Sequence, residues 1–344
     1  MVQGTSGADI DIVQWRERAL SFEREVAKVV IGQTRSIRLI TIAIFARGHV
    51  LLEGDVGVGK TLMLRAVARV VGGAYGRVEG TIDLMPADLI YHTYLNEEGR
   101  PRVDPGPLIA HGSDMSVFFF NEINRARPQV HSLLLRLMAE KAVNAFNADI
   151  PLPHVLVFAD RNQIEKEETF ELPAAARDRF FMEIAVQAPQ DRQLRQDLIF
   201  NPRYYDVDSL IEELSSGLLE YTKLNGVAAR IQQEIQVSNT LQQYVVSLWD
   251  AVRYPEQNGI DLQGIDMARL VKGGASPRGM GILVRAARIL AWLEGRDHVI
   301  PEDVREVFYE TVAHRIFLNP IYEPRRDEIL PEFCHRIFAN VAVP

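Results

Sequence analysis

The 344-residue sequence contains a single cysteine, Cys334. A lone thiol forms no internal disulfide and no thiolate metal site, and such sparse cysteine is typical of proteins in a reducing cytosol. No apolar run approaches the roughly 20 residues that a membrane-spanning helix needs. Residues 1–15, MVQGTSGADIDIVQW, also lack the basic segment and apolar core of a signal peptide. We therefore expect a cytoplasmic protein with no transmembrane segment.

Dense runs of lysine and arginine are missing as well. The chain has 38 basic residues against 46 acidic ones, which gives a formal net charge of −8 at pH 7. Proteins that follow a nucleic-acid backbone usually carry a concentrated basic patch. Nucleic acid is therefore not the expected partner.

Strand and helix patterns alternate through the first 200 residues. Short, continuous apolar runs, as expected of parallel strands covered on both faces, occur at 49–52, 117–120, 155–158 and 181–186. Helical periodicity occurs at 11–28, 36–45 and 61–71. This half is predicted to be an α/β domain over residues 1–200, N-terminal helix included, with a doubly wound, mostly parallel sheet.

The pattern changes near Asn201-Pro202-Arg203. Beyond this point apolar residues recur at helical spacing, between Leu241 and Val252 and again between Ile282 and Leu293. The second half, residues 201–344, is predicted to be an all-α domain.

A glycine-rich motif lies between the first strand and the helix that follows it. Its residues, Gly54-Asp55-Val56-Gly57-Val58-Gly59-Lys60-Thr61, match the pattern GxxxxGK[ST] of phosphate-binding loops. The backbone N–H groups of such a loop curl around phosphate oxygens, Lys60 adds a full charge, and the Thr61 hydroxyl faces Mg²⁺. We expect ATP and Mg²⁺ as cofactors, with Gly54, Asp55, Gly57, Val58, Gly59, Lys60, Thr61 and Leu62 binding the nucleotide. An ordinary glycine-rich turn would not explain the lysine, the threonine and the flanking elements together.

A second apolar strand, 116–120, ends in Asn121-Glu122. In P-loop enzymes this position holds an acid on the metal side and a base that activates water, so Glu122 is the candidate base and Asn121 the candidate metal-side residue. The metal-side residue is usually Asp. Because Asn121 lacks that charge, Mg²⁺ is expected to bind less tightly, and turnover is expected to be about tenfold slower than with Asp.

These residues resemble the MoxR family of AAA+ ATPases, and the resemblance runs over roughly 26–316. The segments that carry it are Val30-Ile31-Gly32-Gln33, Gly48-His49-Val50-Leu51-Leu52-Glu53-Gly54, Asn121-Glu122-Ile123-Asn124-Arg125-Ala126, Leu172-Pro173-Ala174-Ala175-Ala176-Arg177-Asp178-Arg179-Phe180 and Gly274-Ala275-Ser276-Pro277-Arg278. Together they imply a P-loop AAA+ domain followed by a helical lid.

The resemblance also implies roles for individual residues. Val30 and Ile31 would line the adenine pocket, and Asn162 would be the sensor that positions the attacking water. Arg179 would be the arginine finger presented to the neighbouring subunit, although Arg177 departs from the apolar residue usual there and leaves open which arginine reaches across. A surface ion pair with Asp178 is the alternative for Arg179. In the lid, Arg278 would be the second sensor, which contacts the γ-phosphate.

An arginine finger that acts on the nucleotide of a neighbouring subunit implies a homo-oligomeric ring, which is a hexamer in this family. The implied function is ATP hydrolysis coupled to remodelling of a client or adaptor protein, or to insertion of its metal cofactor. In this family the partner often carries a von Willebrand factor A domain, and segment 83–102 would be an insertion near the ring's pore. The alternatives are a nucleotide-gated scaffold that hydrolyses ATP weakly, and a nucleic-acid motor, which the charge balance disfavours.

Overall fold

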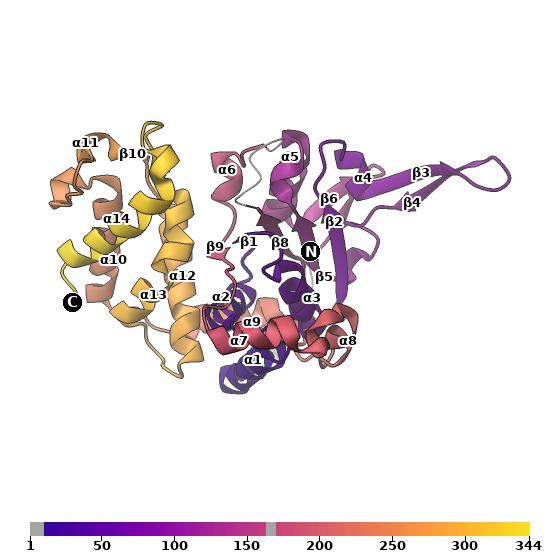
Figure 1. The fold of residues 1–344 in the computed structure, drawn as a ribbon, viewed down its shortest axis with the longest axis horizontal. Helices are drawn as coiled ribbons and strands as arrows, with labels where there is room; N and C mark the ends of the chain where they lie inside the picture. Colours follow the sequence, from indigo (N-terminus) through magenta and orange to yellow (C-terminus); the bar gives the residue numbers. More distant parts are fainter. Residues whose placement is uncertain (1–9, 163–169) are drawn as a thin grey trace. The chain divides into compact units, whose positions relative to one another are not determined.

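The computed structural model describes residues 10–162 and 170–344, and the chain divides into two compact units (Figure 1). The first unit spans residues 22–222. The second comprises residues 223–344 together with residues 10–21, so the division falls within helix α1 (Ile12–Ala27). Each unit is described separately.

The first unit contains a five-stranded sheet with helices on its faces. Its sheet strands are β1 (Val50–Glu53), β2 (Ala74–Glu79), β5 (Met115–Asn121), β8 (Leu156–Arg161) and β9 (Met182–Ala185). Its helices are α2 (Thr34–Phe45), α3 (Lys60–Val71), α4 (Pro86–Ile90), α5 (Pro128–Glu140), α6 (Ala174–Arg177), α7 (Arg192–Phe200) and α8 (Val207–Glu212). The fold is that of a P-loop α/β domain.

The strand order of this sheet is β2-β5-β8-β1-β9, and every neighbouring pair is parallel. Parallel strands end at the same edge, so the residues that follow β1, β5 and β8 meet there. Strand β8 lies between the other two, with Phe120 of β5 opposite Ala159 and Leu52 of β1 opposite Asp160. The glycine-rich loop and the polar end of β5 are thereby brought to one edge.

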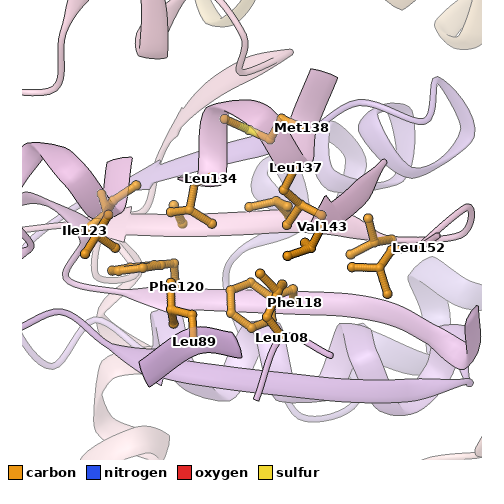
Figure 2. Packing of buried hydrophobic residues seen from close by; sticks show 14 of the residues in the cluster. Leu89, Leu108, Phe118, Phe120, Ile123, Leu134, Leu137, Met138, Val143 and Leu152 are labelled. Carbon is orange, nitrogen blue, oxygen red and sulfur yellow. The ribbon is translucent and has the colours of Figure 1, made fainter. Parts of the chain in front are cut away.

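A buried apolar cluster fixes one face of this sheet (Figure 2). Phe118 and Phe120 of β5 point into it and pack with Leu134 and Leu137 of α5. Val157 and Ala159 of β8 belong to the same cluster. Side chains alternate along a strand, so Asn121 and Asp160, one residue further along each strand, face the opposite side.

Two antiparallel hairpins lie outside the five-stranded sheet. Strands β3 (Tyr91–Leu95) and β4 (Pro101–Pro105) form one, which extends away from the sheet of its own unit (Figure 1). Strands β6 (Ala142–Ala145) and β7 (Ala148–Pro151) form the other. The rings of Tyr91 and Phe146 lie with centroids 5.8 Å apart and connect the two hairpins.

The second unit is almost entirely helical. Its helices are α9 (Leu224–Glu234), α10 (Asn239–Arg253), α11 (Met267–Leu270), α12 (Pro277–Leu293), α13 (Pro301–Val312) and α14 (Arg326–Asn340). A two-stranded ribbon of β10 (Val271–Gly273) and β11 (Phe317–Leu318) joins them. The N-terminal residues belong here because Trp292 Nε1 of α12 donates to Ile12 O over 2.8 Å.

The structure confirms the predicted fold class, but its division falls at 222/223 and not at the 200/201 boundary expected from the sequence. Segment 201–222 binds to α3: Gly217 and Leu218 donate their N–H groups to Arg69 O and Val70 O, and Asp208 pairs with Arg65. These contacts attach the segment to the α/β unit despite its helical composition.

Candidate nucleotide-binding site

The glycine-rich loop begins directly after β1 and ends in α3. Gly57 and Gly59 have left-handed backbones, with φ of +82° and +90°, and a Cβ built at either position meets no atom within 4 Å. Gly54 is different, because a Cβ there would lie 2.2 Å from Val186 O. No side chain caps the first turn of α3. Its N–H groups therefore remain available to phosphate oxygens.

Lys60 lies at the centre of the site and is only 6% exposed. Its Nζ donates to Gly54 O and to Asn162 Oδ1, each at 2.6 Å, and lies 3.4 Å from Asp160 Oδ2. Arg161 O, at 3.4 Å, is a fourth acceptor, so four oxygens from the ends of two strands hold the ammonium group that would contact the phosphates.

Asn162 connects Lys60 to Glu122. Its Nδ2 donates to Glu122 Oε1 over 3.1 Å, while its Oδ1 accepts from Lys60. An ammonium group can only donate and a carboxylate can only accept, so this orientation of the amide is the one that satisfies both neighbours. The candidate sensor and the candidate base therefore contact each other directly.

Asp160 is the buried carboxylate of the site, with its side chain 3% exposed. Its Oδ1 accepts the Glu122 N–H over 2.6 Å. Burial raises the pKa of this carboxyl above its ordinary value, and the Glu122 N–H and the Lys60 ammonium oppose that rise. These two donors favour the ionised form that burial disfavours.

The backbone at Glu122 is left-handed, with φ of 52°. Three contacts hold it: the Glu122 N–H bonds to Asp160, Gly80 N–H donates to Asn121 O over 2.7 Å, and His131 Nε2 donates to Ile123 O over 2.8 Å. A side chain at position 80 would collide with this turn, because a Cβ there would lie 2.1 Å from Glu122 O. The turn aims the Glu122 carboxylate at Asn162 and at Arg125, whose Nη1 lies 2.8 Å from Oε2.

The metal-side candidates differ in their surroundings. Thr61 is half-buried in the first turn of α3. Asn121 is 8% exposed, and its side-chain amide has no hydrogen-bond partner among residues 10–162 and 170–344. Uncommitted oxygens at these positions, with the open loop and a buried carboxylate, suit a hydrated Mg²⁺ ion and a polyphosphate.

Val30 and Ile31 lie in the turn between α1 and α2. Val30 is buried and Ile31 is half-buried. The neighbouring Gln33 donates its side-chain amide to Gln187 O, just beyond β9. Since β9 pairs with β1, this bond holds the turn at the edge of the sheet where the glycine-rich loop begins.

Lys60, Glu122, Arg125, Asp160 and Asn162 form a connected group, here called the Lys60 cluster. The candidate arginine fingers are not among its members. Arg179 is half-buried, its Nη1 lies 3.5 Å from Ala175 O, and it forms no ion pair, with Asp178 or otherwise, in the described part of the chain. Arg177 already has an interaction of its own. Arg278 belongs to the helical unit, where it is exposed in the first turn of α12.

Sequence reasoning missed two residues of the cluster, Asp160 and Arg125. Asp160 ends an apolar strand, which is the signal that identified Glu122, and it precedes Asn162 by two positions. Arg125 lies one helical turn after Glu122 within the segment already singled out. The place of Asp160 in the cluster depends on β8 lying beside β5, which a single sequence does not state, whereas Arg125 is a local contact of Glu122.

Comparisons with known proteins agree with this geometry. Residues 49–182 match the family described as "ATPase family associated with various cellular activities (AAA)", and residues 266–333 match the AAA lid domain. Protein MoxR of Methylorubrum extorquens is 60% identical over 98% of both chains. The chain belongs to the MoxR family of AAA+ ATPases.

Two further proteins match most of this chain. Chaperone MoxR1 of Mycobacterium tuberculosis is 37% identical over 93% of this chain and 81% of its own length. A crystal structure of a protein from Cytophaga hutchinsonii superposes with a TM-score of 0.82, at 30% identity and 97% coverage of both chains. Within the described residues, no helix is long and apolar enough to cross a bilayer.

Proposed function

We propose that this MoxR-family chain binds ATP with Mg²⁺ and hydrolyses it at the Lys60 cluster. The observation that supports this most directly is the bridge formed by Asn162, which contacts both the phosphate-binding lysine and the candidate base. A purely structural asparagine would not need to join these two groups.

Each residue of the site has a distinct task. Lys60 leaves its protein acceptors for the β- and γ-phosphates, and the loop from Gly54 to Leu62 cradles them with N–H groups. Glu122 accepts a proton from the attacking water, and Asn162 positions that water beside the γ-phosphate. Bound Mg²⁺ supplies charge neutralisation on the phosphates, with Thr61 and Asn121 on its side of the site. Val30 and Ile31 cover the adenine.

The site is completed by two further arginines. Arg179 neutralises charge on the nucleotide of the neighbouring subunit in a homo-oligomeric ring, a hexamer, and its lack of an ion pair within the described chain supports this role over Arg177. Arg278 contacts the γ-phosphate and thereby links the state of the nucleotide to the helical lid. Hydrolysis is thereby coupled to changes in subunit shape.

The ring acts in the cytoplasm on a client or adaptor protein. It either remodels that protein or assists the insertion of a metal cofactor into it. Partners with a von Willebrand factor A domain fit this role. The β3–β4 hairpin is the proposed contact surface, since Tyr94, Leu95 and Val103 expose 49%, 70% and 51% of their area. The name of the M. tuberculosis relative, a chaperone, is consistent with a protein client.

A nucleotide-gated scaffold with weak hydrolysis is the second candidate, and the uncharged Asn121 favours it. Steady-state ATP turnover by the purified chain distinguishes the two, with Glu122→Gln as the hydrolysis-defective reference and Lys60→Ala as the binding-defective one. Turnover well above the Glu122→Gln background supports the ATPase. Tight ATP binding with turnover equal to that background supports the scaffold, and stimulation by DNA would favour a nucleic-acid motor instead.

A further inference from the structure

The uncharged Asn121 has a carboxylate as its neighbour. Phe120 of β5 lies opposite Ala159 of β8, so the next residues, Asn121 and Asp160, are neighbours on adjacent parallel strands, which lie about 4.8 Å apart. Both side chains face away from the apolar cluster that holds Phe120 and Ala159. Strand β5, which carries an acid at this position in other P-loop enzymes, has the amide of Asn121 there. Strand β8 has the carboxylate of Asp160 at the neighbouring position.

The Asp160 carboxylate has capacity left for further ligands. It accepts one N–H, from Glu122, and lies 3.4 Å from Lys60 Nζ. An ionised carboxylate offers about four lone-pair sites. At least one direction therefore remains for a hydrogen bond from a metal-bound water.

Charge balance also requires a second cation near Asp160 once nucleotide binds. Lys60 is the cation that compensates this buried carboxylate in the structure. When Lys60 turns to the phosphates, Asp160 would keep the Glu122 N–H but would be left buried without an oppositely charged partner, which is strongly unfavourable. A dication held beside the phosphates restores the balance, whereas an amide at position 121 does not.

We propose that Asp160 supplies the magnesium site with the negative charge that Asn121 lacks, by accepting hydrogen bonds from water on the ion. This rests on the proposed binding of Mg²⁺ with ATP. Judged from β5 alone, the magnesium site lacks negative charge. With Asp160 beside Asn121, Asn121→Asp by itself tightens Mg²⁺ binding little, because it places two carboxylates side by side.

The competing explanation is that Asp160 only anchors the Glu122 turn and neutralises Lys60. In that case its replacement would weaken folding and nucleotide binding regardless of what stands at position 121. A swap of the two residues separates the explanations, because Asn121→Asp combined with Asp160→Asn keeps the number of carboxylates and moves the charge from β8 to β5.

The experiment measures equilibrium binding of a fluorescent ATP analogue as Mg²⁺ is titrated, with Glu122→Gln present throughout to prevent turnover. Four proteins are compared: the parent, Asn121→Asp, Asp160→Asn and the swapped double variant. We expect Asp160→Asn to raise the half-maximal Mg²⁺ concentration about tenfold, the swap to return it to within about threefold of the parent, and Asn121→Asp to change it less than threefold.

Equal shifts on replacing Asp160 in both backgrounds, or no shift at all, would overturn the proposal. If Asp160→Asn does not fold, as judged by thermal melting, the swapped variant decides alone: a parent-like Mg²⁺ midpoint supports the proposal and a raised midpoint overturns it. Failure of the parent to bind the analogue at any Mg²⁺ concentration would instead contradict the proposed ATPase itself.

Discussion

Asn162 donates to Glu122 over 3.1 Å and, through its oxygen, accepts from Lys60 over 2.6 Å. One amide therefore links the proposed phosphate-binding lysine to the proposed catalytic base. Replacement of Asn162 is expected to affect the chemical step much more than the binding of ATP.

For Asn162→Ala we expect turnover to fall about 100-fold, because a positioned donor at the reacting centre typically contributes this much. ATP affinity should change less than about threefold, since the loop and Lys60 remain. Single-turnover hydrolysis and equilibrium binding measure the two quantities. Asn144→Ala, at an exposed asparagine that bonds to Asp149 in the β6–β7 hairpin, is the matched control. Equal losses in binding and turnover would argue against a role in positioning water.

Lys60→Ala should abolish ATP binding and also lower the melting temperature. The second effect arises because Asp160, 3% exposed, loses its cation, and an unpaired buried charge costs on the order of 3 kcal/mol. Adding Asp160→Asn should restore the melting temperature without restoring binding. Calorimetry and nucleotide titration test the pair, with Lys272→Ala at an exposed position as the control. Retained ATP affinity in Lys60→Ala would remove the phosphate-loop assignment.

Arg179 should act on the nucleotide of a neighbouring subunit. Mixtures of Arg179→Ala and Glu122→Gln subunits, each defective alone, should then recover part of the activity, because some interfaces pair an intact Glu122 with an intact Arg179. Turnover measured across mixing ratios tests this. Arg192→Ala, at an exposed arginine in α7, should stay active alone. Strictly additive, unrescued defects in the mixtures would contradict a shared site.

His131 should make the α/β unit sensitive to acid. Burial lowers its pKa below 6.5, and its Nδ1 has no hydrogen-bond partner among the described residues. Protonation would add a second buried donor there. Since the folded-state pKa is depressed, stability is fully present above pH 6.5 and is lost as pH falls through the folded-state value.

The measurement is the melting temperature of the parent and of His131→Gln as a function of pH below 6.5. The variant should lose less stability on acidification than the parent. His154 also has a lowered pKa, mainly from burial, so it leaves some pH dependence in both proteins. An exposed-site control, His111→Gln, should follow the parent. Identical curves for His131→Gln and the parent would show that this imidazole does not titrate in that window.

The sequence predicted the parts of the site whose signals are contiguous. The glycine-rich loop and the paired Asn121-Glu122 each lie in one short segment, and the structure brings them to one edge of the sheet. Asp160 could not be assigned in this way, because its importance comes from the position of β8 between β5 and β1. That order is a property of the folded sheet.

The elements that were not predicted have weak hydrophobic patterns in the sequence. Strand β2 mixes Gly76, Arg77 and Glu79 with few apolar residues, since it lies at the edge of the sheet. Strands β3 and β4 are exposed at every position and so show no alternation of buried and exposed residues. Segment 201–222 is helical in character yet packs on α3, which moved the boundary between the units.

The β3–β4 hairpin leaves and re-enters the α/β unit at nearly the same place. Gly106 N–H donates to Ile90 O over 2.6 Å, and Leu108 N–H donates to Leu89 O over 3.0 Å, so the base of the hairpin is closed by backbone bonds. None of its strand residues pairs with the five-stranded sheet. An insertion at the tip of the hairpin adds only the small entropic cost of closing a longer loop. The hairpin is thus structurally independent of the five-stranded sheet, so its length and surface chemistry can change without moving the residues around Lys60.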